Sequence, residues 1–145
     1  DHATLAETPW GGLGMTICYD MRFPYLYRDL AKAGADFLTA PSAFTVPTGR
    51  AHWHVLLRAR AIETGCYVFA PAQVGEHAEG RKTYGHSLIV GPWGDVLADG
   101  GEDVGVITAT IDVAQVAEAR SRVPSLFNDR PYAAPKSIAK AQAAE

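Results

Sequence analysis

Short apolar runs alternate with amphipathic stretches along most of the chain. Strand residues face opposite sides of a sheet in turn, whereas helix residues return to one face every 3.6 positions, so the two patterns can be told apart. The apolar runs predict strands over residues 13–18, 37–40, 66–70 and 104–111, and a hairpin that pairs 86–90 with 95–98. The amphipathic stretches predict a helix from about Pro24 to Gly34, a longer one over 52–64, and a third over 112–120.

Polar segments that contain proline and glycine predict loops at residues 42–50 and 75–82. Strands that alternate with helices favour parallel pairing, and the later hairpin adds antiparallel strands. We therefore expect a single α/β domain over residues 1–132, followed by a C-terminal tail over residues 133–145.

Composition narrows the class of protein. The chain has 145 residues, of which 48% are hydrophobic and 20% charged, as is ordinary for a globular domain. The net charge is -3 and the basic residues are dispersed, so nucleic acid is not an expected partner. The longest apolar runs are too short to cross a bilayer, so no membrane is expected either. Two widely spaced cysteines are typical of a reducing compartment, which predicts a cytoplasmic protein.

Cys18 lies where the first predicted strand leads into a helix. A helix N-terminus places partial positive charge near such a residue and favours its thiolate. The backbone N–H of Tyr19 is then well placed to donate to a developing oxyanion. The alternative is a buried structural cysteine, because free cysteine is among the most buried residue types. Cys66 lies inside an apolar run without such a turn and is interpreted as structural.

Charged pairs allow both structural and functional interpretations. Arg22 can pair with Asp20 across one turn, or it can bind a carboxylate through two parallel hydrogen bonds. Taken alone, these residues favour the structural pair. Arg60 and Glu63 stand three positions apart on the longest predicted helix, which predicts an ion pair on the helix face.

The histidines do not form a recognisable metal or protease motif. His52 and His54 are two positions apart and do not share a helix face. No Cys/His spacing typical of zinc sites is present, so no metal is expected. His86 is interpreted as a hydrogen-bonded core residue or a group that supports a site, and the role of His77 stays open.

Six segments, in order, resemble the nitrilase, or carbon–nitrogen hydrolase, superfamily. The stretch from Gly14 to Pro24 resembles the segment that carries the family's cysteine nucleophile. The other segments are Pro41–Phe44, Ala51–Thr64, Tyr84–Ser87, Pro92–Gly94 and Arg130–Tyr132. The resemblance extends from about Pro9 to Tyr132. It is nearest to the Nit branch and, within that branch, to the deaminated-glutathione amidase subgroup.

The resemblance implies a Glu–Lys–Cys triad, in which Glu is the general base, Lys stabilises the tetrahedral oxyanion and the cysteine forms a thioester. Cys18 matches this nucleophile, and the Tyr19 N–H matches an oxyanion donor. Arg22 matches the residue that receives the substrate carboxylate, which reverses the preference for a structural pair. Phe44 and Thr48 match positions that line the substrate pocket. The resemblance implies a homodimer, and it implies no metal or organic cofactor.

The family's Glu and Lys lie upstream of the nucleophile. Only Glu7, and no lysine, precedes Cys18, and Tyr25 stands where many members have Glu. We therefore expect this chain to be a fragment, or to need a separate polypeptide that supplies Glu and Lys, and to be inactive alone. The implied fold is roughly the C-terminal half of an α-β-β-α sandwich.

The implied reaction is hydrolysis of the amide bond in a small carboxylate-bearing amide, either a 2-oxo acid ω-amide or deaminated glutathione. One alternative is an N-carbamoyl amino acid hydrolase or another amidase of the superfamily. The other alternative is a truncated binding or scaffold domain without turnover.

Overall fold

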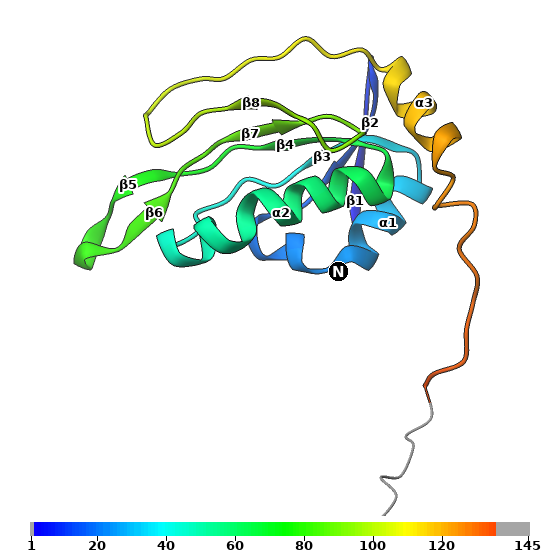
Figure 1. The fold of residues 1–145 in the computed structure, drawn as a ribbon, viewed down its shortest axis with the longest axis horizontal. Coiled ribbons are helices and arrows are strands. Elements are labelled where there is room, and N and C mark those ends of the chain that lie inside the picture. The colour runs from blue at the N-terminus through cyan, green and yellow to red at the C-terminus, as the bar shows by residue number, and fades with distance from the viewer. Residues whose placement is uncertain (1, 136–145) are drawn as a thin grey trace, which may run out of the picture.

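An antiparallel hairpin opens the fold. In the computed structural model, which describes residues 2–135, β1 (Thr4–Thr8) pairs with β2 (Gly11–Met15). The next strands, β3 (Ala35–Thr39) and β4 (Tyr67–Ala70), join β2 in parallel, as the alternation of strands and helices predicted. The predicted hairpin is also confirmed. Its strands complete a sheet of order β1-β2-β3-β4-β7-β8 (Figure 1), and they are β7 (Leu88–Val90) and β8 (Val96–Asp99).

Two helices cover one face of this sheet (Figure 1). α1 (Pro24–Lys32) follows β2, and α2 (Val46–Thr64) follows β3. Leu30 of α1 and Leu57 of α2 are fully enclosed in a core cluster together with residues of β3, β4 and β7. The helices thus hold the carboxyl ends of β2 and β3, where Cys18 and Phe44 follow, in a fixed position.

The other face of the sheet is covered only in part. α3 (Ala114–Arg122) lies at one end of the molecule (Figure 1). Its Val116 side chain packs against Phe37 and Tyr67. An open apolar groove of about 500 Å³ lies over the same face and is lined by side chains that include Trp10 and Phe69.

The expected loop over residues 42–50 is present over residues 42–45 but wrong from Val46 onward, where α2 begins. Thr45 takes the N-cap position and Pro47 lies in the first turn, where its missing N–H costs no hydrogen bond. Proline is typical of loops and equally typical of a helix start, so the residue type alone does not distinguish the two. The predicted helix end is confirmed, since Gly65 closes α2 with a left-handed φ of 63°.

The expected loop over residues 75–82 is wrong as well. β5 (Val74–Glu76) and β6 (Lys82–Tyr84) form a small separate hairpin. Its tip is the short 3-10 helix η2 (Ala78–Gly80). Because only Thr83 of these strands is buried, the segment carries little apolar signal, and its polar pattern concealed the strand pairing.

Two predicted strands differ from the structure. The first ends at Met15, three residues before Cys18, which instead opens the 3-10 helix η1 (Cys18–Arg22). The strand expected over 104–111 forms no ladder within residues 2–135, and Val104 and Val106 are 93% and 92% exposed. The helix predicted from residue 112 is present as α3. Of the expected tail over 133–145, residues 136–145 lie outside the described part.

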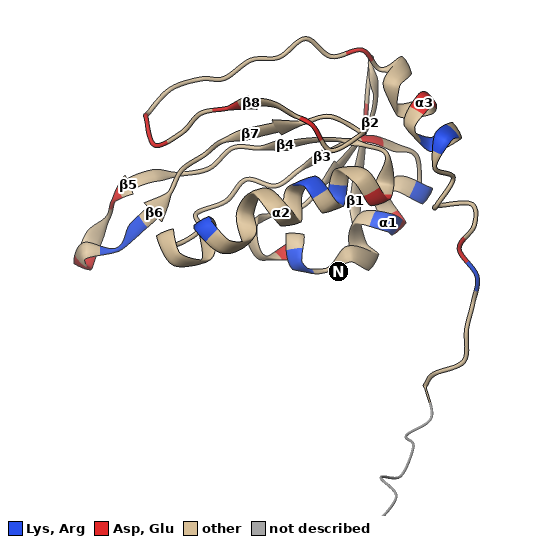
Figure 2. Cartoon of the chain, in the orientation of Figure 1, with Lys and Arg blue, Asp and Glu red and all other residues tan. Residues whose placement is uncertain are grey.

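Charges of both signs are interspersed along the helices and loops (Figure 2). Arg28 and Lys32 of α1, for example, both contact Asp129 beyond α3. Among the described residues, no helix combines the length and apolar character needed to cross a bilayer.

Candidate active site

Cys18 occupies a strained turn between β2 and α1. Its φ is 46°, in the left-handed region that few residues other than glycine adopt. The turn is held from two sides, because the Cys18 N–H donates to Pro41 O at 2.9 Å and the Asp20 carboxylate accepts the Ile17 N–H at 2.9 Å. Such strain persists only where surrounding contacts enforce it, and it is concentrated at functional sites. The half-buried thiol is therefore held in position on a rigid turn.

The Tyr19 N–H lies in the first turn of η1, where helix N–H groups have no partner within the helix. Within residues 2–135, no hydrogen bond joins this N–H to a backbone or side-chain acceptor outside η1. It can therefore donate to an atom bound beside Cys18. The Tyr19 side chain is 64% exposed and faces the Arg22 guanidinium, whose central carbon lies 5.3 Å from the ring centroid.

Arg22 lies among aromatic rings rather than beside an acid. Its guanidinium carbon is 5.3 Å from the Phe44 ring centroid, and both terminal nitrogens are 3.4 Å from Nδ1 of His52. In the part of the chain that the structure describes, no carboxylate forms an ion pair with it. The structural pair with Asp20 is therefore wrong, since that carboxylate accepts the Ile17 N–H instead. Because the guanidinium lies over these rings and contacts only an imidazole nitrogen, no acid within residues 2–135 occupies its hydrogen-bond donors, which can turn to a ligand.

Phe44 and Thr48 differ in how they relate to this site. Phe44 is 8% exposed, packs against Trp53 with ring centroids 5.0 Å apart, and places its ring beneath Arg22. Thr48 is half-buried in the first turn of α2, and its hydroxyl donates to Thr45 O at 3.2 Å. The structure thus joins Phe44 to the Cys18 turn through Arg22, whereas the Thr48 hydroxyl forms its hydrogen bonds within residues 2–135 with Thr45 alone.

Arg60 of α2 supports the Cys18 turn through a hydrogen bond to its backbone. Its side chain is almost completely buried, donates from Nε to Met21 O at 2.8 Å and binds Glu63 at 2.6 Å. The predicted pair with Glu63 is present, but it is not a surface pair. Because Met21 belongs to η1, Arg60 anchors the Cys18 turn to α2.

Tyr27 completes the support. Burial raises the pKa of its phenol to about 12, and the phenol shares a hydrogen bond with Thr16, two residues before Cys18. The phenol therefore remains protonated and neutral in the folded protein at all ordinary pH values.

Cys66 has the structural role that the sequence predicted. It is fully buried, its thiol donates to Ala35 O at 3.2 Å, and burial raises the pKa of that thiol. A neutral, enclosed thiol is a poor nucleophile.

Sequence reasoning missed two associations of histidine. His52 contacts Arg22 although thirty positions separate them, and no spacing rule indicates such a contact. His54 and His86 meet at the carboxylate of Asp99. The glycine Gly101, two positions after Asp99, indicates from sequence alone that β8 ends here. Nothing in the sequence indicates that Asp99 meets His54 of α2.

Comparisons with known proteins agree with this geometry. The carbon–nitrogen hydrolase family profile matches residues 1–121. The deaminated glutathione amidase of Synechocystis sp. is 55% identical over 117 residues, which are 81% of this chain and 43% of that protein. The crystal structure of the C. elegans NitFhit protein, at 51% identity, has a TM-score of 0.82 and covers 85% of this chain and 30% of its own.

A third relative bears on the cysteine. A variant of the amidase from Nesterenkonia sp. AN1 carries the acetamide moiety of fluoroacetamide covalently at its active-site cysteine. It is 26% identical, with a TM-score of 0.75, over 90% of this chain and 45% of its own. These matches confirm the resemblance and the α/β fold class. The chain spans less than half the length of each of these relatives.

Proposed function

The chain belongs to the carbon–nitrogen hydrolase family, and we propose that the complete protein hydrolyses the amide bond of a small carboxylate-bearing amide through a thioester on Cys18. A 2-oxo acid ω-amide or deaminated glutathione is the substrate class. The observation that carries the proposal is the pairing of a cysteine at a positive φ with an arginine four positions later that has no acidic partner among residues 2–135.

The chemistry assigned to this chain has two steps. The Cys18 sulfur attacks the amide carbon, and the carbonyl oxygen takes up negative charge while the Tyr19 N–H donates to it. The C–N bond then breaks, and the amine, which is ammonia for a primary amide, leaves with the proton that the Cys18 thiol gave up, while the acyl group stays on sulfur. Water then attacks the thioester, which releases the carboxylic acid and restores the thiol.

Arg22 is assigned the substrate's carboxylate. A guanidinium binds a carboxylate through two parallel charge-assisted hydrogen bonds, and the flanking Tyr19 and Phe44 rings fix its plane. Binding this distant group positions the amide carbon relative to the sulfur, which lowers the entropic part of the barrier.

The general base and the oxyanion-stabilising lysine are assigned to a segment outside this chain. The partly covered sheet face supports this assignment, because the apolar groove with Trp10, Leu13 and Phe69 offers a surface for a second layer of structure. Exposed apolar patches of this kind are typical of interaction sites. A homodimer of the complete protein stays a prediction.

Adduct mapping tests the proposal. The complete protein is mixed with an ω-amide of a 2-oxo acid, quenched in acid and digested, and the peptides are analysed by mass spectrometry. We expect the acyl mass on the peptide with Cys18 and an unmodified peptide with Cys66. Cys18→Ala should abolish turnover and Cys66→Ala should leave most of it. An adduct on Cys66, or turnover without Cys18, would contradict the mechanism.

A further inference from the structure

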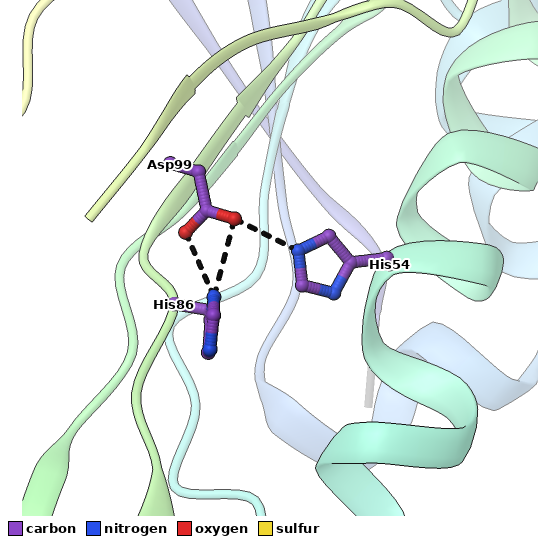
Figure 3. A group of neighbouring side chains, drawn as sticks. All are labelled: His54, His86 and Asp99. Carbon is purple, nitrogen blue, oxygen red and sulfur yellow. Dashed lines mark hydrogen bonds and ion pairs between the residues drawn. The ribbon is translucent and has the colours of Figure 1, made fainter. Parts of the chain in front are cut away.

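Three potential metal ligands from separate elements converge beside α2 (Figure 3). His54 extends from the helix, His86 lies between β6 and β7, and Asp99 ends β8. Nε2 of His54 is 3.0 Å from one Asp99 oxygen, and Nδ1 of His86 is 2.9 Å and 3.1 Å from the two carboxylate oxygens. The three ligand atoms lie within 4.8 Å of one another.

His86 is held in an unusual backbone conformation. Its φ is 57°, a left-handed value at a residue that is not glycine. Its N–H donates to Gly101 O at 2.6 Å, its carbonyl accepts the Trp53 indole N–H at 2.7 Å, and its ring stacks on Tyr84 with centroids 4.3 Å apart. These contacts direct the imidazole toward Asp99.

Asp99 and His54 are also oriented by their neighbours. The Gly101 N–H donates to Asp99 Oδ1 at 2.9 Å, and the rings of His54 and Tyr84 form a T-shaped pair with centroids 6.1 Å apart. Metal sites depend on such supporting contacts, because they fix ligand rings and carboxylates before the ion arrives. The arrangement therefore contains both the ligands and their support.

Two imidazoles and a carboxylate suit a divalent first-row transition ion. Zn²⁺ binds both ligand types at about 2.0–2.2 Å, and three protein ligands leave a position for water. The three side chains are 32%, 21% and 34% exposed in sequence order, so an ion and its water can reach them from solvent.

We propose that His54, His86 and Asp99 form a Zn²⁺ site, with Nε2, Nδ1 and the carboxylate as ligands. The ion would join α2 to the end of the β7–β8 hairpin. The site is separate from the Cys18 turn, although Tyr84 links the two regions because its N–H donates to Phe44 O at 2.9 Å. The alternative is that the Asp99 carboxylate only accepts hydrogen bonds from the two histidines and that the group has no affinity for metal. The experiment must distinguish the two.

Competition with a chromophoric zinc chelator measures the stoichiometry and affinity of Zn²⁺ binding to the complete protein, purified without an affinity tag. We expect Asp99→Asn and His86→Asn to bind one equivalent of Zn²⁺ less than wild type, or to bind that equivalent at least about a hundredfold more weakly. Loss of a residue that only supports the ligands already lowers metal affinity about 10–100-fold, and these variants lose a ligand itself. Asparagine is chosen at position 86 because it tolerates a positive φ. Cys18→Ser and His77→Gln serve as controls and should retain that equivalent.

Equal stoichiometry and affinity in wild type, Asp99→Asn and His86→Asn would overturn the proposal. A measurement on unaltered protein covers the case in which these variants do not fold. Crystals of the wild type soaked in Zn²⁺ should give an anomalous peak bonded to His54, His86 and Asp99. Crystals in which these side chains keep their direct hydrogen bonds and show no such peak would also overturn it.

Discussion

The guanidinium of Arg22 lies over the ring of Phe44 at 5.3 Å, although the two residues follow different strands. η1 follows β2, the Phe44 segment follows β3, and the two strands are parallel neighbours. Parallel strands end at the same edge of a sheet, and their following loops meet there. The contact therefore joins the Cys18 turn to the segment that the resemblance assigns to the substrate pocket.

Arg22→Lys should impair the complete enzyme selectively. Lysine keeps the charge, but it cannot make two parallel hydrogen bonds or stack as a plane between Tyr19 and Phe44. Loss of a charged hydrogen bond costs about 1.5–3 kcal/mol, so kcat/KM for an acidic ω-amide should fall roughly ten- to a hundredfold. Steady-state kinetics with an acidic and a neutral amide, together with melting temperatures, give the comparison. Equal losses on both substrates would return Arg22 to a purely structural role.

The isolated chain of residues 1–145 should have negligible amidase activity. Members of a catalytic triad act as a unit, and loss of one removes most of the rate. Here the lysine and glutamate of the family pattern have no counterpart, because no lysine precedes Cys18 and Glu7 lies too close to Cys18 to match the family glutamate. Ammonia release from purified chain measures the activity, and release at the rate of the complete protein would show that the mechanism is misassigned.

Gly49→Ala should destabilise the fold although alanine is the better helix former. A Cβ at this position would lie 2.2 Å from the Tyr84 ring, so the ring or the helix must move. Overpacking of this kind costs about 1–3 kcal/mol. Ala51→Gly at an exposed position of the same helix is the control and should cost about 0.5–1 kcal/mol. Chemical denaturation measures both, and a Gly49→Ala variant more stable than wild type would contradict the packing.

Stability should fall at alkaline pH through Tyr27. Burial raises the pKa of Tyr27 from 10.0 to about 12, so the unfolded chain loses this proton at lower pH than the folded one. The contribution of the neutral Tyr27 phenol to the free energy of unfolding is complete below pH 10 and is lost as pH rises through 12. It is on the order of 2–3 kcal/mol. Denaturation of wild type and Tyr27→Phe between pH 9 and about 12 tests it, because the phenylalanine variant should lack this part of the decline. Parallel declines in the two proteins would refute it.

The sequence by itself determined the family, the parallel core of the sheet and the candidate site residues of the Cys18 turn, which are Cys18, Tyr19 and Arg22. Apolar runs separated by amphipathic stretches located β3, β4, α1 and the end of α2, because burial of one helix face leaves a clear periodicity. Gly65 marked the end of α2 for a local reason, since its left-handed φ favours glycine. These features depend on neighbours within a few positions.

Tertiary structure decided what depends on distant residues. The β5–β6 hairpin is polar, so its pairing leaves no periodic signal, and α2 begins at Val46 because Thr45 and Pro47 act here as a helix start. The partners of Arg22 are another example. Arg22 stands two positions from Asp20 in the sequence, but its guanidinium contacts two aromatic rings and His52 instead. The same reason applies to His54, His86 and Asp99. Residues far apart in sequence meet only after the sheet has brought their elements together.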